Sequence, residues 1–133
     1  MTEDATALHA RAGAESAAGD LESAAATYAE AAALRRAAGE QGPLAHELRH
    51  FGQTLLELGR PDEAEGPLSE ALALYRALGT GGVTLANALR PMALLHEAQR
   101  RPEEARRLWR QARALYAAAG IAAGVEEADD HLG

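Results

Sequence analysis

The chain has 133 residues, of which 47% are hydrophobic and 25% charged, so it is long enough for one domain with its own hydrophobic core. Its net charge of −7 argues against generic binding to nucleic acid, whose phosphates require a basic surface. The absence of cysteine excludes disulfides, thiolate nucleophiles and cysteine-bound metal centres.

The start of the chain predicts a cytoplasmic protein. Residues 1–4 contain no basic region, and no apolar run of signal-peptide length follows them. No segment reaches the roughly 20 apolar residues that a membrane span needs. All of the positive side chains are Arg, a composition that points to a bacterial genome rich in GC.

An internal repeat organises the sequence. Similar six-residue segments begin at Gly19, Gly59 and Arg100, and the intervals between them are 40 and then 41 residues. The three copies remain aligned at further positions along the chain. The matched positions are Ala24/Ala64/Ala105, Tyr28/Leu68/Trp109, Ala31/Ala71/Ala112, Leu34/Leu74/Leu115 and Gly39/Gly79/Gly120. Five matched positions at one period indicate a repeat architecture.

Each unit is predicted to form two antiparallel helices. The low content of aromatic residues and the high content of Ala and Leu favour helices over strands. We place the units at about 5–39, 43–79 and 83–120, followed by a capping helix at about 121–132. Proline at the start of the second helices and glycine just after their ends match the usual asymmetry of helix termini. An apolar stripe at helical spacing predicts the core: Ala64, Leu68, Ala71, Leu72, Tyr75 and Leu78.

The first helices are clearest in the second unit, where Leu48, Phe51, Gly52 and Leu55 share one face. Together with Gly59, Ala64, Leu68 and Ala71, they resemble the tetratricopeptide-repeat family. The length of the unit resembles the longer repeats of kinesin light chains and of bacterial regulators. The resemblance implies an all-α, right-handed superhelix of three helical hairpins plus a capping helix, with the first helices lining a concave groove.

This resemblance makes outward-facing residues of the first helices candidates for binding a peptide. They are His9 in the first unit, His46, Arg49 and Gln53 in the second, and Asn87, Arg90, Leu94 and Glu97 in the third. His9, Arg49 and Arg90 occupy equivalent positions. They are similar in part to the carboxylate clamp of some family members, because guanidinium groups bind carboxylates with two parallel hydrogen bonds. The alternative is that these Arg side chains are solvated or paired within the chain.

One motif suggests an enzyme. The segment His46-Glu47-Leu48-Arg49-His50 matches H-E-x-x-H, in which two histidines bind zinc and the glutamate activates water. The predicted fold lacks the sheet and the third-ligand motif of such proteases. We therefore predict no metal and no cofactor, although adventitious metal binding by the two histidines is an alternative.

Two further features of the sequence predict local structure or a surface property. Pro91 lies inside a predicted helix, and we expect it to bend that helix or delay its start. Arginines at six positions between 100 and 113 form a basic stripe, which is either a solvated face or a docking surface for an acidic partner.

The sequence therefore predicts a non-enzymatic scaffold that binds a protein or peptide partner, without nucleic acid or membrane. A self-associating scaffold, and then a metal-dependent hydrolase, are the alternatives.

Overall fold

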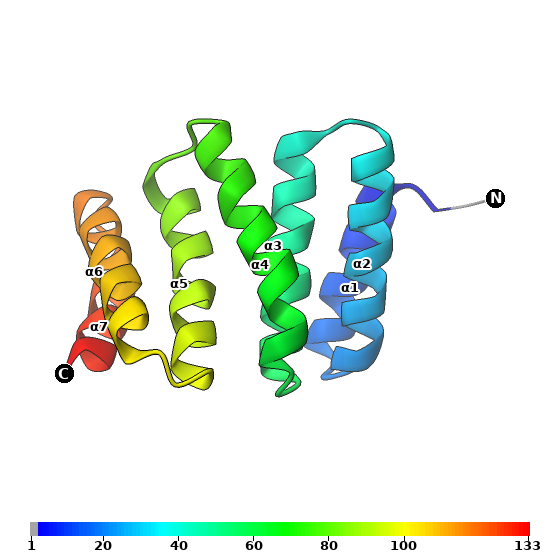
Figure 1. Cartoon of the computed structure of the whole chain (residues 1–133). Coiled ribbons are helices and arrows are strands. Elements are labelled where there is room, and N and C mark those ends of the chain that lie inside the picture. The colour runs from blue at the N-terminus through cyan, green and yellow to red at the C-terminus, as the bar shows by residue number, and fades with distance from the viewer. Residues whose placement is uncertain (1–2) are drawn as a thin grey trace.

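The computed structural model describes residues 3–133, which form seven α-helices (Figure 1). Residues 1 and 2, which belong to the segment interpreted as the start of a cytoplasmic protein, lie outside the described residues. The helices are α1 (Ala5–Ala17), α2 (Leu21–Ala37), α3 (Gln41–Glu57), α4 (Pro61–Ala77), α5 (Gly82–Ala98), α6 (Pro102–Ala118) and α7 (Ala122–Leu132).

Each helix packs against the next one along the chain, and α3 also contacts α5, the equivalent helix of the following unit. Figure 1 shows the resulting row of helical hairpins, with α1 and α7 at opposite ends of the row. This arrangement confirms the predicted all-α, helical-repeat superhelix. Within residues 3–133, no helix combines the length and the apolar character needed to cross a bilayer.

Local sequence explains where the helices begin. The carboxylate of Asp4 accepts a hydrogen bond from the backbone N–H of Ala7 at 2.8 Å, which caps α1. Asp20 does the same for α2 through the N–H of Ser23. Pro61 and Pro102 occupy the first positions of α4 and α6, where a backbone N–H would have no partner inside the helix.

The turn between the two helices of a unit requires one residue in the left-handed region. Gly19 and Gly59 take this place with φ of 82° and 75°, and Arg100 takes it in the third unit with φ of 60°. Glycine adopts this conformation without steric cost, whereas a side chain with a Cβ atom is strained there. The third turn therefore carries a strain that the other two lack.

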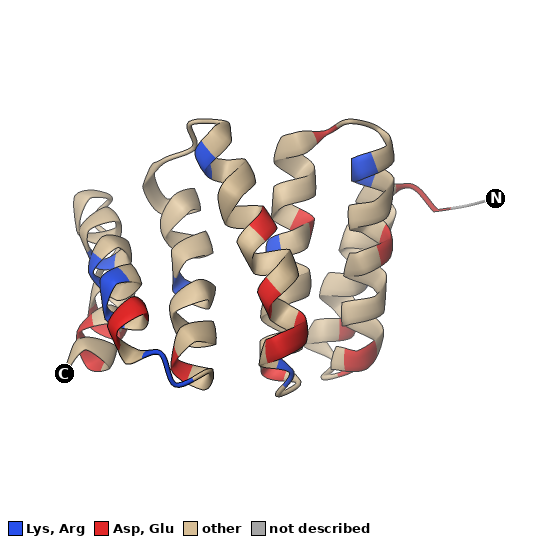
Figure 2. Ribbon diagram, viewed as in Figure 1, with Lys and Arg blue, Asp and Glu red and all other residues tan. Residues whose placement is uncertain are grey.

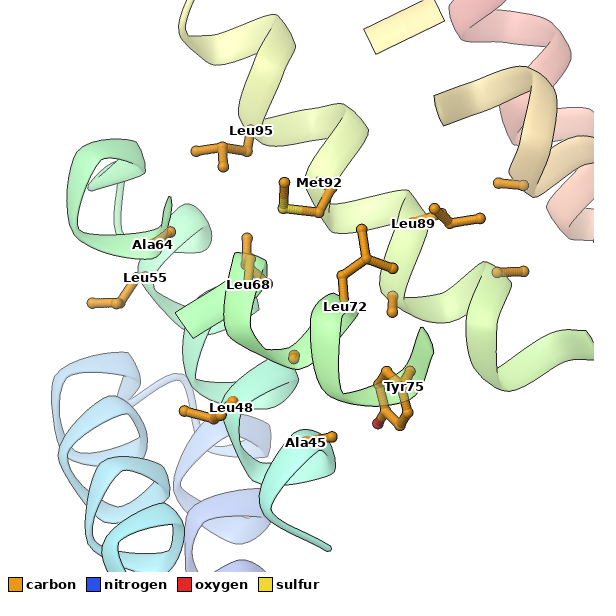
Figure 3. Close-up of a cluster of buried hydrophobic side chains, with 14 of the residues drawn as sticks. Ala45, Leu48, Leu55, Ala64, Leu68, Leu72, Tyr75, Leu89, Met92 and Leu95 are labelled. Atoms are coloured by element: carbon orange, nitrogen blue, oxygen red, sulfur yellow. The ribbon is translucent and has the colours of Figure 1, made fainter. Parts of the chain in front are cut away.

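The core lies between the helices and follows the repeated columns of small and large residues. Ala64, at 0% exposure, lets α4 approach its neighbours closely, and Leu68 fills the space beside it. Figure 3 shows side chains of α3, α4 and α5 meeting there, among them Leu48, Leu72 and Met92. The predicted stripe is confirmed up to Tyr75, but Leu78 is 46% exposed because it lies beyond the last turn of α4.

The predicted effect of Pro91 on the start of its helix is wrong. Helix α5 begins at Gly82 and continues through Pro91 to Ala98. The proline ring is fully buried, so packing offsets the backbone hydrogen bond that its nitrogen cannot donate.

The difference between the 40- and 41-residue intervals is located in one connection. Residues 78–81 join α4 to α5, whereas three residues join each of the other consecutive helices. The extra residue lies outside the helices, so the packing columns of the units remain in register.

Candidate functional site

The predicted binding residues lie on α1, α3 and α5, and we call the surface that carries them the inner face. It comprises His9, His46, Arg49, Gln53, Asn87, Arg90, Leu94 and Glu97. The structure divides this surface into a histidine cluster at the N-terminal end, a small pocket in the middle and a polar network at the C-terminal end.

The pocket lies between α3 and α5 and has a volume of about 110 Å³. Its lining consists of Gln53, Leu56, Glu57, Arg90, Pro91 and Leu94. Three of the predicted residues thus meet here, and the lining combines three apolar side chains with Gln53, Glu57 and Arg90. An apolar wall with a few polar groups is the usual character of a ligand pocket.

At the N-terminal end, three histidines from two helices come together. The ring centroids of His9 and His46 are 5.5 Å apart, those of His9 and His50 are 5.3 Å apart, and those of His46 and His50 are 4.7 Å apart. The ring of Tyr28 stacks on His50 from α2, at 5.1 Å. The sequence singled out His46 and His50 as a pair, but not His9 as their neighbour.

Glu47 lies next to His9 and is only 1% exposed. Its Oε1 accepts a hydrogen bond from Nδ1 of His9 at 2.5 Å, and its Oε2 is 3.7 Å from Nε of Arg35 on α2. An ionised carboxylate only accepts hydrogen bonds, so Nδ1 of His9 is the donor in this contact. The carboxylate therefore fixes the orientation of His9 and joins three helices.

This position of Glu47 differs from that of the glutamate in an H-E-x-x-H protease. A general base must reach the water that it deprotonates, but Glu47 is closed off from solvent, hydrogen-bonded to His9 of α1 and within ion-pair distance of Arg35 of α2. The geometry does not support water activation by this group.

Arg49 donates hydrogen bonds to two histidines of the cluster. Its Nη2 donates to Nδ1 of His46 at 3.3 Å and to Nε2 of His50 at 3.4 Å, and its Nη1 donates to Oε1 of Gln53 at 2.9 Å. A guanidinium group has no acceptor, so both of these histidine nitrogens present lone pairs to the same cationic nitrogen.

Burial and the Arg49 charge keep these two rings neutral. Burial is the larger cause and lowers the pKa of His50 from 6.5 to about 3, with Arg49, His46 and His9 adding to the effect. The pKa of His46 is lowered in the same direction, again first by burial and then by Arg49.

At the C-terminal end, Arg90 binds Glu127 of α7. Both guanidinium nitrogens Nε and Nη2 donate to the carboxylate, the latter at 2.8 Å. This hydrogen bonding holds the pKa of Glu127 below its ordinary value, against the smaller opposing effect of burial. Helix α7 thus places a carboxylate where the sequence predicts that Arg90 faces a ligand.

The two remaining predicted residues also have partners within the chain. The Oδ1 of Asn87 accepts a hydrogen bond from the hydroxyl of Tyr116 at 2.6 Å. Glu97 accepts from Nε1 of Trp109 at 2.8 Å and contacts Nδ1 of His131 at 2.9 Å. These contacts orient Asn87 and Glu97 and tie the inner face to α6 and α7.

Figure 2 shows the arginines of the basic stripe along α6 and on the connection that precedes it. Arg113 Nε lies 2.5 Å from Oδ1 of Asp129, and Arg106 donates to the backbone carbonyl of Leu132. Part of the stripe therefore holds α7 in place.

Sequence reasoning did not predict that His50, Glu47 and Tyr28 would meet His9 in one cluster. One signal was present, because the repeat puts His9 at the position equivalent to Arg49, which lies between His46 and His50 on the neighbouring helix. A search across the repeat, instead of along the motif, would have found the third histidine.

The chain is similar to known repeat proteins in sequence and in fold. The sequence profile of the family described as "Tetratricopeptide repeat" matches residues 3–77. The search of curated proteins gave no match. Among solved structures, one similar fold is "Crystal structure of BtubC (BKLC) from P. vanneervenii", with a TM-score of 0.74 and 18% sequence identity. The similarity covers 96% of this chain and 62% of that one, so the chain spans less than two thirds of the length of BtubC.

Proposed function

Because the chain belongs to the tetratricopeptide-repeat family, we propose that it is a non-enzymatic, cytoplasmic scaffold whose inner face binds a peptide or protein segment. Repeats of this family generally mediate interactions between proteins. The net charge of −7 favours such a partner over nucleic acid. The Lys-free composition is the support for a bacterial source.

The pocket between α3 and α5 is the observation that carries this proposal. Leu56, Pro91 and Leu94 line it, and they suit one apolar side chain of a bound segment. Arg90 at its edge already holds a carboxylate, that of Glu127, through two nitrogens. An acidic side chain or a terminal carboxylate of the partner makes the same type of contact with Arg90 by taking the place of Glu127.

Selection from a random-peptide display library tests the proposal and does not require the natural partner to be identified. Peptides selected on the wild-type chain are expected to combine an apolar side chain with a carboxylate. Leu56→Glu introduces a charge into the pocket wall, and we expect it to reduce binding of the selected peptides at least tenfold.

Ser69→Glu is the matched control, since Ser69 is an exposed residue of the outer helix α4 and the substitution adds the same charge. Circular dichroism of both variants establishes that they are folded. Equal loss in the two variants, or selected peptides that bind Leu56→Glu normally, would contradict a role for the pocket.

Self-association is a second candidate, and a specific surface favours it. An open apolar depression of about 390 Å³ lies where α6 ends and α7 begins, lined by Ala117, Gly120, Ile121, Ala122, Val125 and Glu126. Exposed apolar surface of this kind is typical of contact sites. Light scattering over a range of concentrations tests this candidate. A mass that rises with concentration, and that Ile121→Glu returns to the monomer value, is the result expected of it.

A further inference from the structure

The histidine cluster suggests a chemistry that peptide binding does not use. We propose that His9, His46 and His50 form a binding site for a divalent transition-metal ion, best suited to Zn²⁺, at the N-terminal end of the inner face. One ring nitrogen from each of the three residues lies within 4.8 Å of the other two. Imidazole is a preferred ligand of Zn²⁺, and three histidines with a water molecule form a complete four-coordinate set.

The hydrogen bond between Glu47 and His9 is the second observation. Metal-binding histidines usually donate their other ring N–H to a carboxylate, which fixes the tautomer and raises the basicity of the ligating nitrogen. Glu47 accepts from Nδ1 of His9, so in the neutral form of that ring the lone pair lies on Nε2. The carboxylate thus prepares His9 as a ligand, in place of the catalytic role that the H-E-x-x-H motif suggests.

Packing does not require a carboxylate at this place. The positions equivalent to Glu47 in the next unit and in α7 are Ala88 and Ala128, and both are buried. A glutamate that is 1% exposed at such a position carries a desolvation cost that alanine lacks. Its contacts with His9 and Arg35 offset this cost, and they hold the carboxylate against one of the three rings.

The lone pairs of His46 and His50 already converge on a cation. Both ring nitrogens accept a hydrogen bond from Nη2 of Arg49, at 3.3 and 3.4 Å. A metal ion that takes these two nitrogens must displace the guanidinium group and overcome its charge. Arg49 is therefore a competitor for the site, and its removal is expected to strengthen metal binding.

Titration of the untagged chain with Zn²⁺ by calorimetry, and with Co²⁺ by visible absorption, tests the proposal. We expect one ion per chain with micromolar affinity, and the intense Co²⁺ absorption of tetrahedral coordination. The chain contains no cysteine, so these bands report nitrogen and oxygen ligands alone.

His9→Gln is the decisive variant, because His46 and His50 are one turn apart on α3 and can bind metal weakly as a pair. We expect His9→Gln to lower the affinity at least tenfold, while His131→Gln, at the far end of the chain, leaves it unchanged. Glu47→Gln is expected to lower it by about 10- to 100-fold. Arg49→Met is expected to raise it.

Imidazole NMR spectra of the wild-type chain give a readout that does not depend on the folding of any variant. Zn²⁺ is expected to shift the ring signals of His9, His46 and His50, but not those of His96 and His131. Lack of binding at millimolar metal would overturn the proposal. Binding that His9→Gln leaves intact would also overturn it, because the two histidines of α3 would then suffice. Neither result bears on peptide binding at the pocket, which the display experiment tests separately.

Discussion

A Cβ atom on Gly52 would lie 2.4 Å from Cγ of Leu68, far inside van der Waals contact. The two residues hold α3 and α4 together, because the missing side chain on one helix makes room for the large side chain on the other. Leu68 is almost fully buried, so it has little freedom to move away.

Gly52→Ala is therefore expected to destabilise the chain, although alanine favours helices. The cost of overpacking is about 1–3 kcal/mol in the free energy of unfolding. Urea denaturation measures it. Gly13→Ala is the matched control, since no atom of another segment lies within 4 Å of the added Cβ atom on α1, and we expect it to stabilise by about 0.5–1 kcal/mol. Equal effects of the two substitutions would contradict the close contact.

The third turn offers a stabilising substitution. Arg100 has φ of 60° where the first two units have glycine, so Arg100→Gly is expected to relieve left-handed strain and raise the free energy of unfolding by about 1 kcal/mol. Thermal denaturation measures the change. The reverse substitution in the second turn, Gly59→Arg, is expected to destabilise by a similar amount. A lower stability of Arg100→Gly would show that the turn carries no such strain.

The ion pair between Arg90 and Glu127 predicts that the free energy of unfolding depends on pH. The pKa of Glu127 in the folded chain is below its ordinary value of 4.5, so the pair stabilises the fold above that pH. This contribution is lost as the pH falls through the lowered pKa. About a third of each side chain is exposed, so we expect the contribution to stay below about 1 kcal/mol.

Urea denaturation of Glu127→Gln at pH 7 and at pH 3 measures this effect. The variant is expected to be less stable than the wild type at pH 7, and the difference is expected to shrink at pH 3. Glu126→Gln, at an exposed neighbouring position, serves as the control. A difference that grows toward low pH would have the wrong sign for a lowered pKa.

The fluorescence of Trp109 reports how α7 packs against α6. Its indole is buried and stacks on His131, with ring centroids 4.2 Å apart. A Cβ atom on Gly124 would lie 2.4 Å from Cγ of Tyr116, so Gly124→Leu is expected to push α7 away from α6 and shift the Trp109 emission to the red. Ala123→Leu, at an exposed position, is expected to leave the emission unchanged.

The repeat itself was predictable because its signal is periodic. Ala24, Ala64 and Ala105 recur at intervals of 40 and 41 residues, and all three are buried, since each unit packs its helices closely around the same small residue. Leu34 matches Leu74 and Leu115 in sequence but is 39% exposed. It lies near the end of the row of helices, so the same residue type has fewer neighbours there.

The polar contacts of the inner face were not predictable in the same way. The pairs His9–Glu47 and Arg90–Glu127 join residues 38 and 37 positions apart, and each pair links two successive units without an equivalent pair elsewhere in the repeat within residues 3–133. Periodicity places the backbone of such residues but does not say which side chain meets which. The sequence placed Arg90 on a binding surface, but it contained no signal that α7 would supply a carboxylate to it.

The four-residue connection between α4 and α5 shows where this architecture accepts change. Residues 78–81 absorb one extra residue without altering the column that runs through Ala64 and Ala105. Length there is uncoupled from the contacts between units, because the additional backbone lies outside every helix. A reporter peptide, or the new termini of a circularly permuted chain, would therefore be best tolerated between Gly79 and Gly81.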